Sequence, residues 1–349
     1  MIAGTPRGFR DILSEEALAR EKIVDTVRAC FGARGYMPVE TPLLEDRAVL
    51  ERAGRVKGSP FRLFDSDGRL LMLRPDLTLP IARLAAGRIG AGALPVRLRY
   101  CAPVVREQES LKGQSRQFTQ MGVELIGGEG AASESEVVAL LAEALEALGV
   151  DGWRIVCGSV VPVAALLGQC APDDAFRERV QGLVHESDLV SLDELIEAAD
   201  LPAPVARALT RIPRVHGGPE ALDEVDALLD AACVPAARRG VAELRRLVDS
   251  LEGTPAADRV SFDFSIINSF DYYTGLIFKG YVDGIAASVA SGGRYDAVLE
   301  NLGMADTAAC GFALSLERVQ EVLGEQGVAG VATPGIRVGE RPLRIAVPK

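Results

Sequence analysis

Apolar residues near the N-terminus recur at the spacing of a helix. Between Ser14 and Phe31 they follow steps of three and four, with acidic residues in the first turn and glycines just beyond the last apolar position. We therefore predict a helix that begins at Ser14. Further along, the apolar runs 61–64 and 70–73 flank the sequence Asp-Ser-Asp-Gly, which predicts a β-hairpin. The chain thus opens with a helix and continues with strands.

Two longer runs with the pattern of strands follow, at 96–106 and 116–127, and a polar segment joins them. After them, residues 133–136 (Ser-Glu-Ser-Glu) have the spacing of a capping box. The apolar stripe from 137 to 148 predicts the helix that this box would start. A short strand is predicted at 153–157.

The second half of the chain contains a long stretch without a strand pattern. From about 160 to 251 it is rich in leucine, alanine and acidic residues with interspersed prolines, which predicts a block of helices. Strand patterns return at 259–267 and 271–282. The glycines after Ser291 indicate a tight turn, and a last helix is expected around 314–323.

Strand patterns on both sides of this block, arranged as hairpins and not in regular β–α alternation, predict an α+β fold. We expect a mostly antiparallel sheet of six or seven strands flanked by helices. The core would span 1–323, interrupted by a helical insertion at about 165–255. The segment 324–349 has the glycine and proline content of a linker or tail, although residues 343–347 alternate like a strand with one buried face.

The composition excludes several classes of protein. The chain has 349 residues with 38 Lys and Arg against 49 Asp and Glu, a net charge of −11, which disfavours broad electrostatic binding to nucleic acid. Its six cysteines form no C-x-x-C pair and it has two histidines, so we expect no metal site. No apolar run approaches the roughly 18 residues of a membrane span, and we expect a soluble, cytoplasmic protein.

Common cofactor and nucleophile motifs are missing from the sequence. It contains no phosphate loop, no complete dinucleotide fingerprint and no G-x-S-x-G elbow, and no cofactor is expected. Polar residues instead cluster within strand patterns, where alternation places Gln120 and Glu124 on one face. Taken singly, each cluster has an ordinary explanation: Asp76 as a helix cap, Arg106 in a surface ion pair, the tyrosines as core residues.

Taken together and in this order, the clusters resemble the catalytic core of a class II aminoacyl-tRNA synthetase of the histidyl type. The resemblance runs from about residue 4 to 323. It rests on the opening sequence 4–11, a first motif at 41–45, a second at 106–107 with 116–120, a third at 311–318, and two histidyl signatures at 271–273 and 291–296.

The resemblance implies a pocket for the amino acid histidine. Asp76 stands where the family has a glutamate that holds the amino group, and Gln120 and Glu124 match residues that bind the amino acid. Tyr273 and Tyr295 match residues around the imidazole. The implied pocket as a whole comprises Asp76, Thr78, Arg106, Gln120, Glu124, Tyr272, Tyr273 and Tyr295.

Departures from the synthetase pattern bear on activity. Arg106 and Arg318 match the family's two ATP-phosphate arginines, but the arginine that contacts substrate carboxylate and phosphate is replaced by Asn268. A neutral amide cannot form a bidentate clamp on either group. The second motif is less basic than in synthetases, and no anticodon-binding sequence follows Leu323. We therefore expect no catalytic residues and a vestigial nucleotide site at Arg106 and Arg318.

This pattern resembles the histidyl-synthetase-like regulatory subunits of ATP phosphoribosyltransferase. The resemblance implies a non-catalytic homodimer, joined through the first motif, that activates a short catalytic subunit and takes part in feedback inhibition by histidine. The end of the chain, 343–349, resembles the start of that catalytic subunit, so the chain could be half of a fusion; a strand of this fold is the alternative. Two other functions stay open: the core of a histidyl-tRNA synthetase, and a stand-alone amino-acid-binding module.

Overall fold

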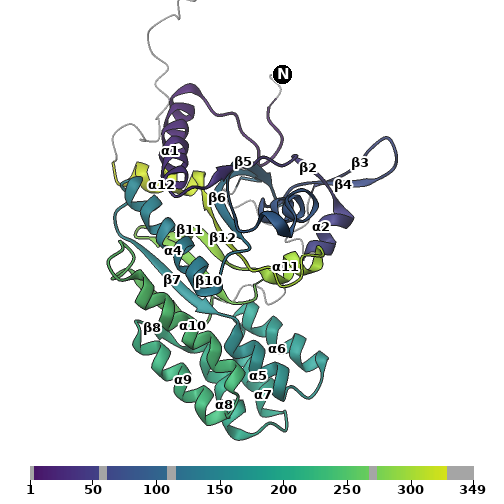
Figure 1. Cartoon of the computed structure of the whole chain (residues 1–349), viewed down its shortest axis with the longest axis vertical. Coiled ribbons are helices and arrows are strands. Elements are labelled where there is room, and N and C mark those ends of the chain that lie inside the picture. Colours follow the sequence, from purple (N-terminus) through teal and green to yellow (C-terminus); the bar gives the residue numbers. More distant parts are fainter. Residues whose placement is uncertain (1–3, 55–60, 108–114, 267–272, 328–349) are drawn as a thin grey trace, which may run out of the picture.

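The computed structural model describes residues 4–54, 61–107, 115–266 and 273–327, and its main feature is one large sheet (Figure 1). The strands lie in the order β1-β5-β6-β12-β11-β10-β7-β9-β8. Their bounds are β1 Met37–Pro38, β5 Val96–Val105, β6 Gln117–Ile126, β12 Ala309–Ser315, β11 Ile285–Arg294, β10 Leu276–Val282, β7 Trp153–Ser159, β9 Val260–Asp263 and β8 His216–Gly217. The pairs β1–β5 and β7–β9 are parallel, and the others are antiparallel.

Two hydrophobic cores cover opposite faces of this sheet. On one face, helices α1 (Ser14–Ala33), α4 (Gly130–Ala147) and α12 (Leu316–Glu325) pack against odd-numbered residues of β6 such as Val123. On the other face, α2 (Arg47–Ala53), α3 (Thr78–Leu84) and α11 (Asp296–Asn301) pack against Tyr100 of β5 and its neighbours. The α+β class predicted from the sequence is confirmed.

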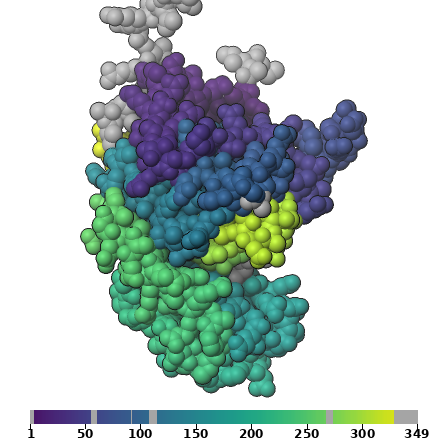
Figure 2. Space-filling view, in the orientation of Figure 1, coloured from purple at the N-terminus to yellow at the C-terminus, as the bar shows by residue number. Residues whose placement is uncertain are grey.

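A lobe of helices lies between β7 and β9 in the chain, and Figure 2 shows it as the teal and green mass below the sheet. Its helices are α5 Val161–Cys170, α6 Asp174–Glu186, α7 Leu189–Glu197, α8 Ala203–Arg211, α9 Glu220–Ala232 and α10 Pro235–Leu251. Helix α10 packs against β7 and α4, so it connects the lobe to the sheet. The short strand β8 also comes from this stretch, where the sequence showed no strand pattern.

A small second sheet stands beside the main one. It has the order β2-β4-β3, formed by β2 Leu44–Asp46, β4 Leu70–Leu73 and β3 Arg62–Phe64. The antiparallel β3–β4 pair is the hairpin predicted from the turn sequence. Short helical turns at Ala85–Ile89, Ala91–Ala93 and Ile212–Arg214 complete the described elements. Among the described residues, no helix is long and apolar enough to cross a membrane.

Three local predictions were wrong. The main sheet has nine strands in the described residues, because the short edge strands β1 and β8 and the central strands β11 and β12 were not predicted. Residues Ser291–Gly293 lie inside β11, and Gly311–Ser315 form β12 before the helix starts. A Cβ atom on Gly292 would lie 2.4 Å from the carbonyl oxygen of Gly311, so glycine here allows close strands and does not mark a turn.

The capping-box prediction was also wrong in its position. Helix α4 begins at Gly130, so Ser133 and Glu134 lie inside its first turns and are buried instead of capping it. The tail from residue 328, the strand pattern at 343–347, Tyr272 and Asn268 lie outside the described residues. Predictions about them, and about the limits of the insertion and tail, stay predictions.

Arg74 ties the small sheet to the main one. Its guanidinium is buried and donates to three backbone carbonyl groups: Nε to Pro103 at 2.9 Å, and Nη1 to Thr41 at 2.6 Å and to Pro42 at 3.3 Å. Burial lowers the pKa of Arg74. The planar fork of arginine is needed because the acceptors lie on two separate segments.

We predict that Arg74→Lys lowers the melting temperature by several degrees. Lysine keeps the charge but cannot reach both segments, and each lost hydrogen bond to a charged group is worth about 1.5–3 kcal/mol. Arg34→Lys, at an exposed ion pair with Glu143, serves as the control and should change little. Equal melting temperatures for Arg74→Lys and the unaltered protein, measured by calorimetry, would contradict this role.

Candidate functional site

A cavity of about 130 Å³ opens on the face of the sheet that carries α3 and α11. The sheet positions its floor, since β6, β11 and β12 are neighbours there. Seven of the eight residues predicted for the pocket line it, and the eighth, Tyr272, lies outside the described residues. The lining residues are Asp76, Thr78, Arg106, Gln120, Glu124, Tyr273, Ser291, Gly292, Tyr295, Gly311, Phe312 and Ala313.

Glu124 lies at the bottom of this cavity with 1% of its surface exposed. Its Oε1 accepts hydrogen bonds from the Thr78 hydroxyl at 2.7 Å and the Tyr100 hydroxyl at 3.4 Å, and its Oε2 accepts one from the Tyr295 hydroxyl. Burial raises the pKa of Glu124 to about 8, although the hydroxyl donors oppose this shift. The pocket therefore contains a carboxyl group that a bound cation would stabilise in its charged form.

Gly311 makes room for the Glu124 carboxyl. The two residues face each other in the β6–β12 pair, and a Cβ atom at position 311 would lie 2.0 Å from Glu124 Oε2. Any larger residue would push the carboxyl group away from Tyr295. The glycine of the third motif is thus required by the position of Glu124.

Asp76 combines two roles that the sequence left as alternatives. Its Oδ1 accepts a hydrogen bond from the backbone N–H of Leu79 at 3.0 Å, in the first turn of α3, and its carboxylate also lines the cavity. The negative charge of Asp76 helps to raise the pKa of both Glu124 and Tyr273. Two acidic groups therefore face one small space.

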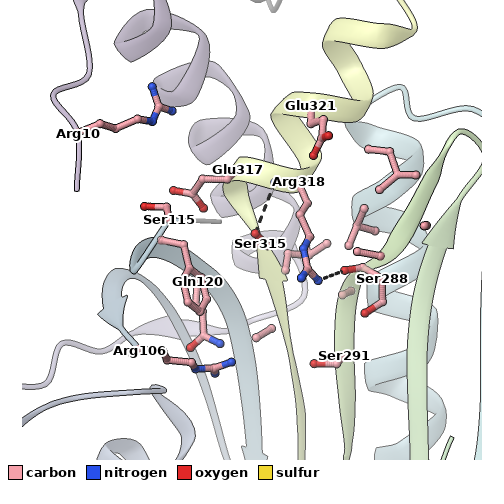
Figure 3. A pocket seen from close by; sticks show the side chains of 18 residues that line it. Arg10, Arg106, Ser115, Gln120, Ser288, Ser291, Ser315, Glu317, Arg318 and Glu321 are labelled. Atoms are coloured by element: carbon pink, nitrogen blue, oxygen red, sulfur yellow. Dashed lines mark hydrogen bonds between the residues drawn. The ribbon is translucent and has the colours of Figure 1, made fainter. Parts of the chain in front are cut away.

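Gln120 provides an unused acceptor in the same space. It is 9% exposed, and within the described residues its side-chain Oε1 has no hydrogen-bond partner. Buried polar atoms are normally paired, so an unpaired one that lines a cavity indicates a missing ligand or water. Figure 3 shows the Gln120 side chain beside Arg106, where the small cavity meets a larger one.

The larger cavity, of about 660 Å³, shares Arg106, Gln120, Ser291 and Ala313 with the small one (Figure 3). Arg106 donates through Nε to the carbonyl of Pro75 at 2.7 Å and its guanidinium lies 5.1 Å from the centre of the Phe118 ring. Arg318 donates to the carbonyl of Ser288. The two predicted nucleotide arginines thus line one cavity. Glu317 and Glu321 also line it, so its charge is mixed.

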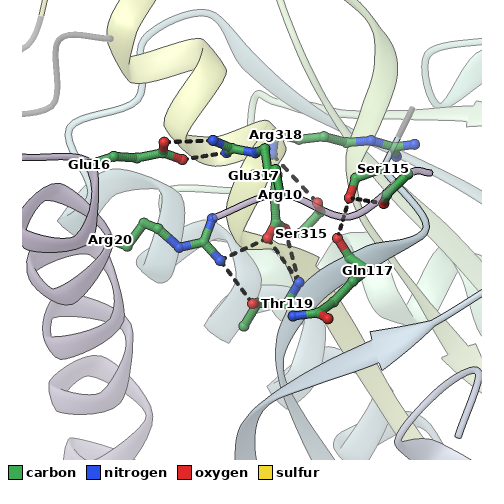
Figure 4. Close-up of polar contacts among 10 residues, drawn as sticks. Arg10, Glu16, Arg20, Ser115, Gln117, Thr119, Ser315, Glu317 and Arg318 are labelled. Carbon is green, nitrogen blue, oxygen red and sulfur yellow. Dashed lines mark hydrogen bonds and ion pairs between the residues drawn. The ribbon is translucent and has the colours of Figure 1, made fainter. Parts of the chain in front are cut away.

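A polar cluster at the mouth of this cavity joins three distant elements (Figure 4). Both carboxylate oxygens of Glu317 accept the backbone N–H of Thr119 at 3.0 Å, and Arg20 donates to Glu317 at 2.8 Å and to the Thr119 hydroxyl at 3.0 Å. Nearby, Arg10 pairs with Glu16. Glu317 thereby holds the start of β6, and so the segment before Gln120, against α1 and α12.

Sequence reasoning missed several of these residues. Tyr100 could have been found, because it faces Gly122 in the strand pair next to Glu124. The contacts of Glu317 gave no local signal, since its partners Arg20 and Thr119 lie in other elements of the chain. Chemically, the small cavity offers two acidic groups, a free amide oxygen and tyrosine hydroxyls, an arrangement that can hold an ammonium group and a neutral polar ring.

We predict that Glu124→Gln changes how stability depends on pH. Because the pKa of Glu124 is raised from its usual 4.5 to about 8, the folded state binds the proton more tightly, and its contribution to the free energy of unfolding falls as pH rises across that interval. Glutamine does not titrate. Relative to the unaltered protein, the melting temperature of the variant should therefore rise from pH 5 to pH 8, measured by calorimetry without ligand.

Glu136→Gln is the control for this measurement. The pKa of Glu136 is lowered, chiefly by its hydrogen bond with Arg97, so its contribution is complete above about pH 5. The melting-temperature difference for the control should stay constant from pH 5 to pH 8. A constant difference for Glu124→Gln as well would show that its carboxyl group is ionised throughout.

Comparison with known proteins gives the same picture across nearly the whole chain. The family model described as histidyl-tRNA synthetase matches residues 8–319. The ATP phosphoribosyltransferase regulatory subunit of Moorella thermoacetica is 36% identical over 329 residues, which cover 94% of this chain and 84% of the relative.

Solved structures agree with this comparison. The structure titled an ATP phosphoribosyltransferase regulatory subunit/histidyl-tRNA synthetase from Bacillus halodurans has a TM-score of 0.84 at 31% identity, covering 93% of this chain and 84% of its own. A histidine–tRNA ligase subunit from Alicyclobacillus acidocaldarius has a TM-score of 0.75 at 32% identity, covering 94% and 99%. The chain therefore belongs to the histidyl-tRNA synthetase family and, within it, to the regulatory subunits of ATP phosphoribosyltransferase.

Proposed function

We propose that this chain acts in the cytoplasm as a non-catalytic partner of a short-form ATP phosphoribosyltransferase catalytic subunit, which it activates and helps to inhibit when histidine accumulates. The observation that carries the proposal is the similarity, along nine-tenths or more of the chain, to relatives named as regulatory subunits of that enzyme. The pocket geometry supports the proposal of a histidine site.

Histidine fits the chemistry of the small cavity. Its ammonium group would lie against Asp76 and Glu124, both acidic and both lining the cavity. The buried Gln120 Oε1 can accept one more ligand N–H. Tyr273 and Tyr295 would face the imidazole, which needs neutral hydrogen-bonding groups and not charges.

The larger cavity supports a vestigial role for its nucleotide-binding residues. Arg106 and Arg318 both bond backbone carbonyl groups in the described structure, and acidic side chains share their cavity. The net charge of −11 likewise gives no electrostatic support for binding tRNA.

A homodimer joined through the first motif is part of the proposal. The apolar side chains of Leu43 and Leu44 are exposed, and the registers of the small sheet put Leu63, 37% exposed, on the same face as Leu44. Exposed apolar side chains on one face favour burial against another chain. A second copy of this chain is the partner that the family resemblance implies.

We predict that adding this chain to a short catalytic subunit raises ATP phosphoribosyltransferase turnover, and that histidine lowers the turnover of the mixture more than that of the catalytic subunit alone.

In Asp76→Ala, histidine affinity should fall about ten- to a hundredfold, the effect of losing one charge-assisted bond. Calorimetry and the concentration for half-inhibition measure this.

Asp46→Ala is the matched control for Asp76→Ala. Asp46 caps α2 through the backbone N–H of Ala48, much as Asp76 bonds the first turn of α3, but it does not line the cavity. The control should lose stability and keep its histidine affinity. If turnover is the same with and without this chain, the proposal is wrong; if only the Asp76→Ala affinity is unchanged, the histidine site lies elsewhere.

The second candidate is a histidyl-tRNA synthetase core, favoured by the family model and by the similarity to a histidine–tRNA ligase subunit. We predict no histidine-dependent ATP–pyrophosphate exchange by the isolated chain, because Asn268 cannot neutralise developing negative charge. Exchange that is detectable, and lost in Arg106→Ala, would establish the synthetase instead.

A further inference from the structure

A partly buried ion cluster lies behind the pocket, on the face of the sheet that carries α4. Arg294, the last residue of β11, bonds Asp296 Oδ2 through Nε at 2.7 Å, and its Nη1 lies 3.8 Å from Glu134 Oε1. Glu134 comes from α4 and is 3% exposed. The residue between Arg294 and Asp296 is Tyr295, whose hydroxyl bonds Glu124 on the pocket side.

Backbone hydrogen bonds connect this cluster to the second pocket tyrosine. The N–H of Thr274 donates to the carbonyl of Arg294 at 2.8 Å, and the N–H of Asp296 donates to the Thr274 hydroxyl at 3.1 Å. Tyr273 directly precedes Thr274. Each of the two tyrosines that line the cavity is therefore a sequence neighbour of residues in this hydrogen-bonded group. One precedes Thr274, and the other lies between Arg294 and Asp296.

The charge of Glu134 is only partly compensated, by Arg294 and by a backbone hydrogen bond from Leu276. Burial raises the pKa of Glu134 to about 7, opposed chiefly by the positive charge of Arg294, while Glu243 on α10 adds to the increase. A void of about 10 Å³ lies beside Glu134 and Arg294, and Glu134 Oε1 has no hydrogen-bond partner within the described residues. A change in one member can therefore rearrange the ion pair, and the bonds of Arg294 and Asp296 to Thr274 link that pair to both tyrosines.

We infer that Glu134 and Arg294 are positioning residues for the ligand pocket, which fix Tyr273 and Tyr295 from the opposite face of the sheet. The inference rests on the proposed binding of histidine in this cavity. Neither side chain lines the cavity, so both would act through the tyrosines. A purely structural ion pair would stabilise the fold without changing the tyrosine positions.

Glu136 provides a matched control on the same helix. It lies two residues after Glu134 and bonds Arg97 through both carboxylate oxygens and Tyr36 through one, at 2.6–2.8 Å. These partners belong to β5 and to the loop after α1, and neither of the two tyrosines that line the cavity lies there. Glu136→Gln thus breaks a partly buried contact outside the cluster.

The test uses fluorine NMR on the full chain, with its six tyrosines labelled as 3-fluorotyrosine. Tyr273→Phe and Tyr295→Phe assign the two pocket signals. We expect Glu134→Gln to shift both of them and to raise the dissociation constant for histidine about three- to tenfold. Glu136→Gln should shift the Tyr36 signal alone and leave the dissociation constant unchanged. Thr274→Val removes the hydroxyl oxygen that accepts the backbone N–H of Asp296, so it should have the same effects as Glu134→Gln. It replaces Glu134→Gln if that variant does not fold.

Unshifted pocket signals in a folded Glu134→Gln would overturn the inference, and so would equal shifts in Glu136→Gln. A double variant of Glu134→Gln with Tyr295→Phe adds a second criterion. If Glu134 acts through the tyrosines, the losses of binding free energy in the two single variants must sum to more than the loss in the double variant. Failure of the unaltered protein to bind histidine would refute the proposed ligand site, while the fluorine shifts would still decide the positioning role.

Discussion

Much of the structure around the pocket follows from placing an acidic side chain, Glu124, in the middle of a sheet. An isolated carboxylate in an apolar interior is strongly unfavourable, so the chain must supply donors or a proton. Three hydroxyl groups, from Thr78, Tyr100 and Tyr295, come from three separate elements to meet it. Gly311 leaves the space that the carboxyl group fills. Since these donors belong to α3, β5 and the β11–α11 junction, the packing of those elements and the charge of the pocket depend on each other.

The division of the sheet into two faces explains how the pocket stays polar within a well-packed protein. Alternation along β6 sends Val123 into the core with α4, and Gln120 and Glu124 into the cavity. The family fold is kept, with a TM-score of 0.84 to a related structure at 31% identity. A synthetase-like binding surface can thus occur in a family of regulatory subunits, because fold and activity are separable.

Local patterns predicted the parts of the fold that depend on local interactions. Helix α1, the β3–β4 hairpin and the β5–β6 pair appeared where periodicity and turn residues placed them. The errors came from tertiary contacts: Gly292 lies in a strand because Gly311 approaches it, a contact that no local pattern reveals. The site divides in the same way. Family resemblance brought together seven cavity residues, whereas Glu317 depends on Thr119, which lies far from it in sequence.

The parallel pairing of β7 and β9 has a consequence for how this family can vary. A parallel neighbour requires a crossover that returns along the full length of the strand. Helix α10, with 17 residues, is about 25 Å long and packs on β7, so it alone can make that return. Helices α8 and α9 flank β8, which pairs with β9 at the edge of the sheet, but α6 and α7 are free of the connection. Gene changes that lengthen, shorten or replace α6 and α7 would alter the outer surface of the lobe and leave the sheet and its cavity intact, which makes this part of the lobe the region where new partner surfaces can evolve.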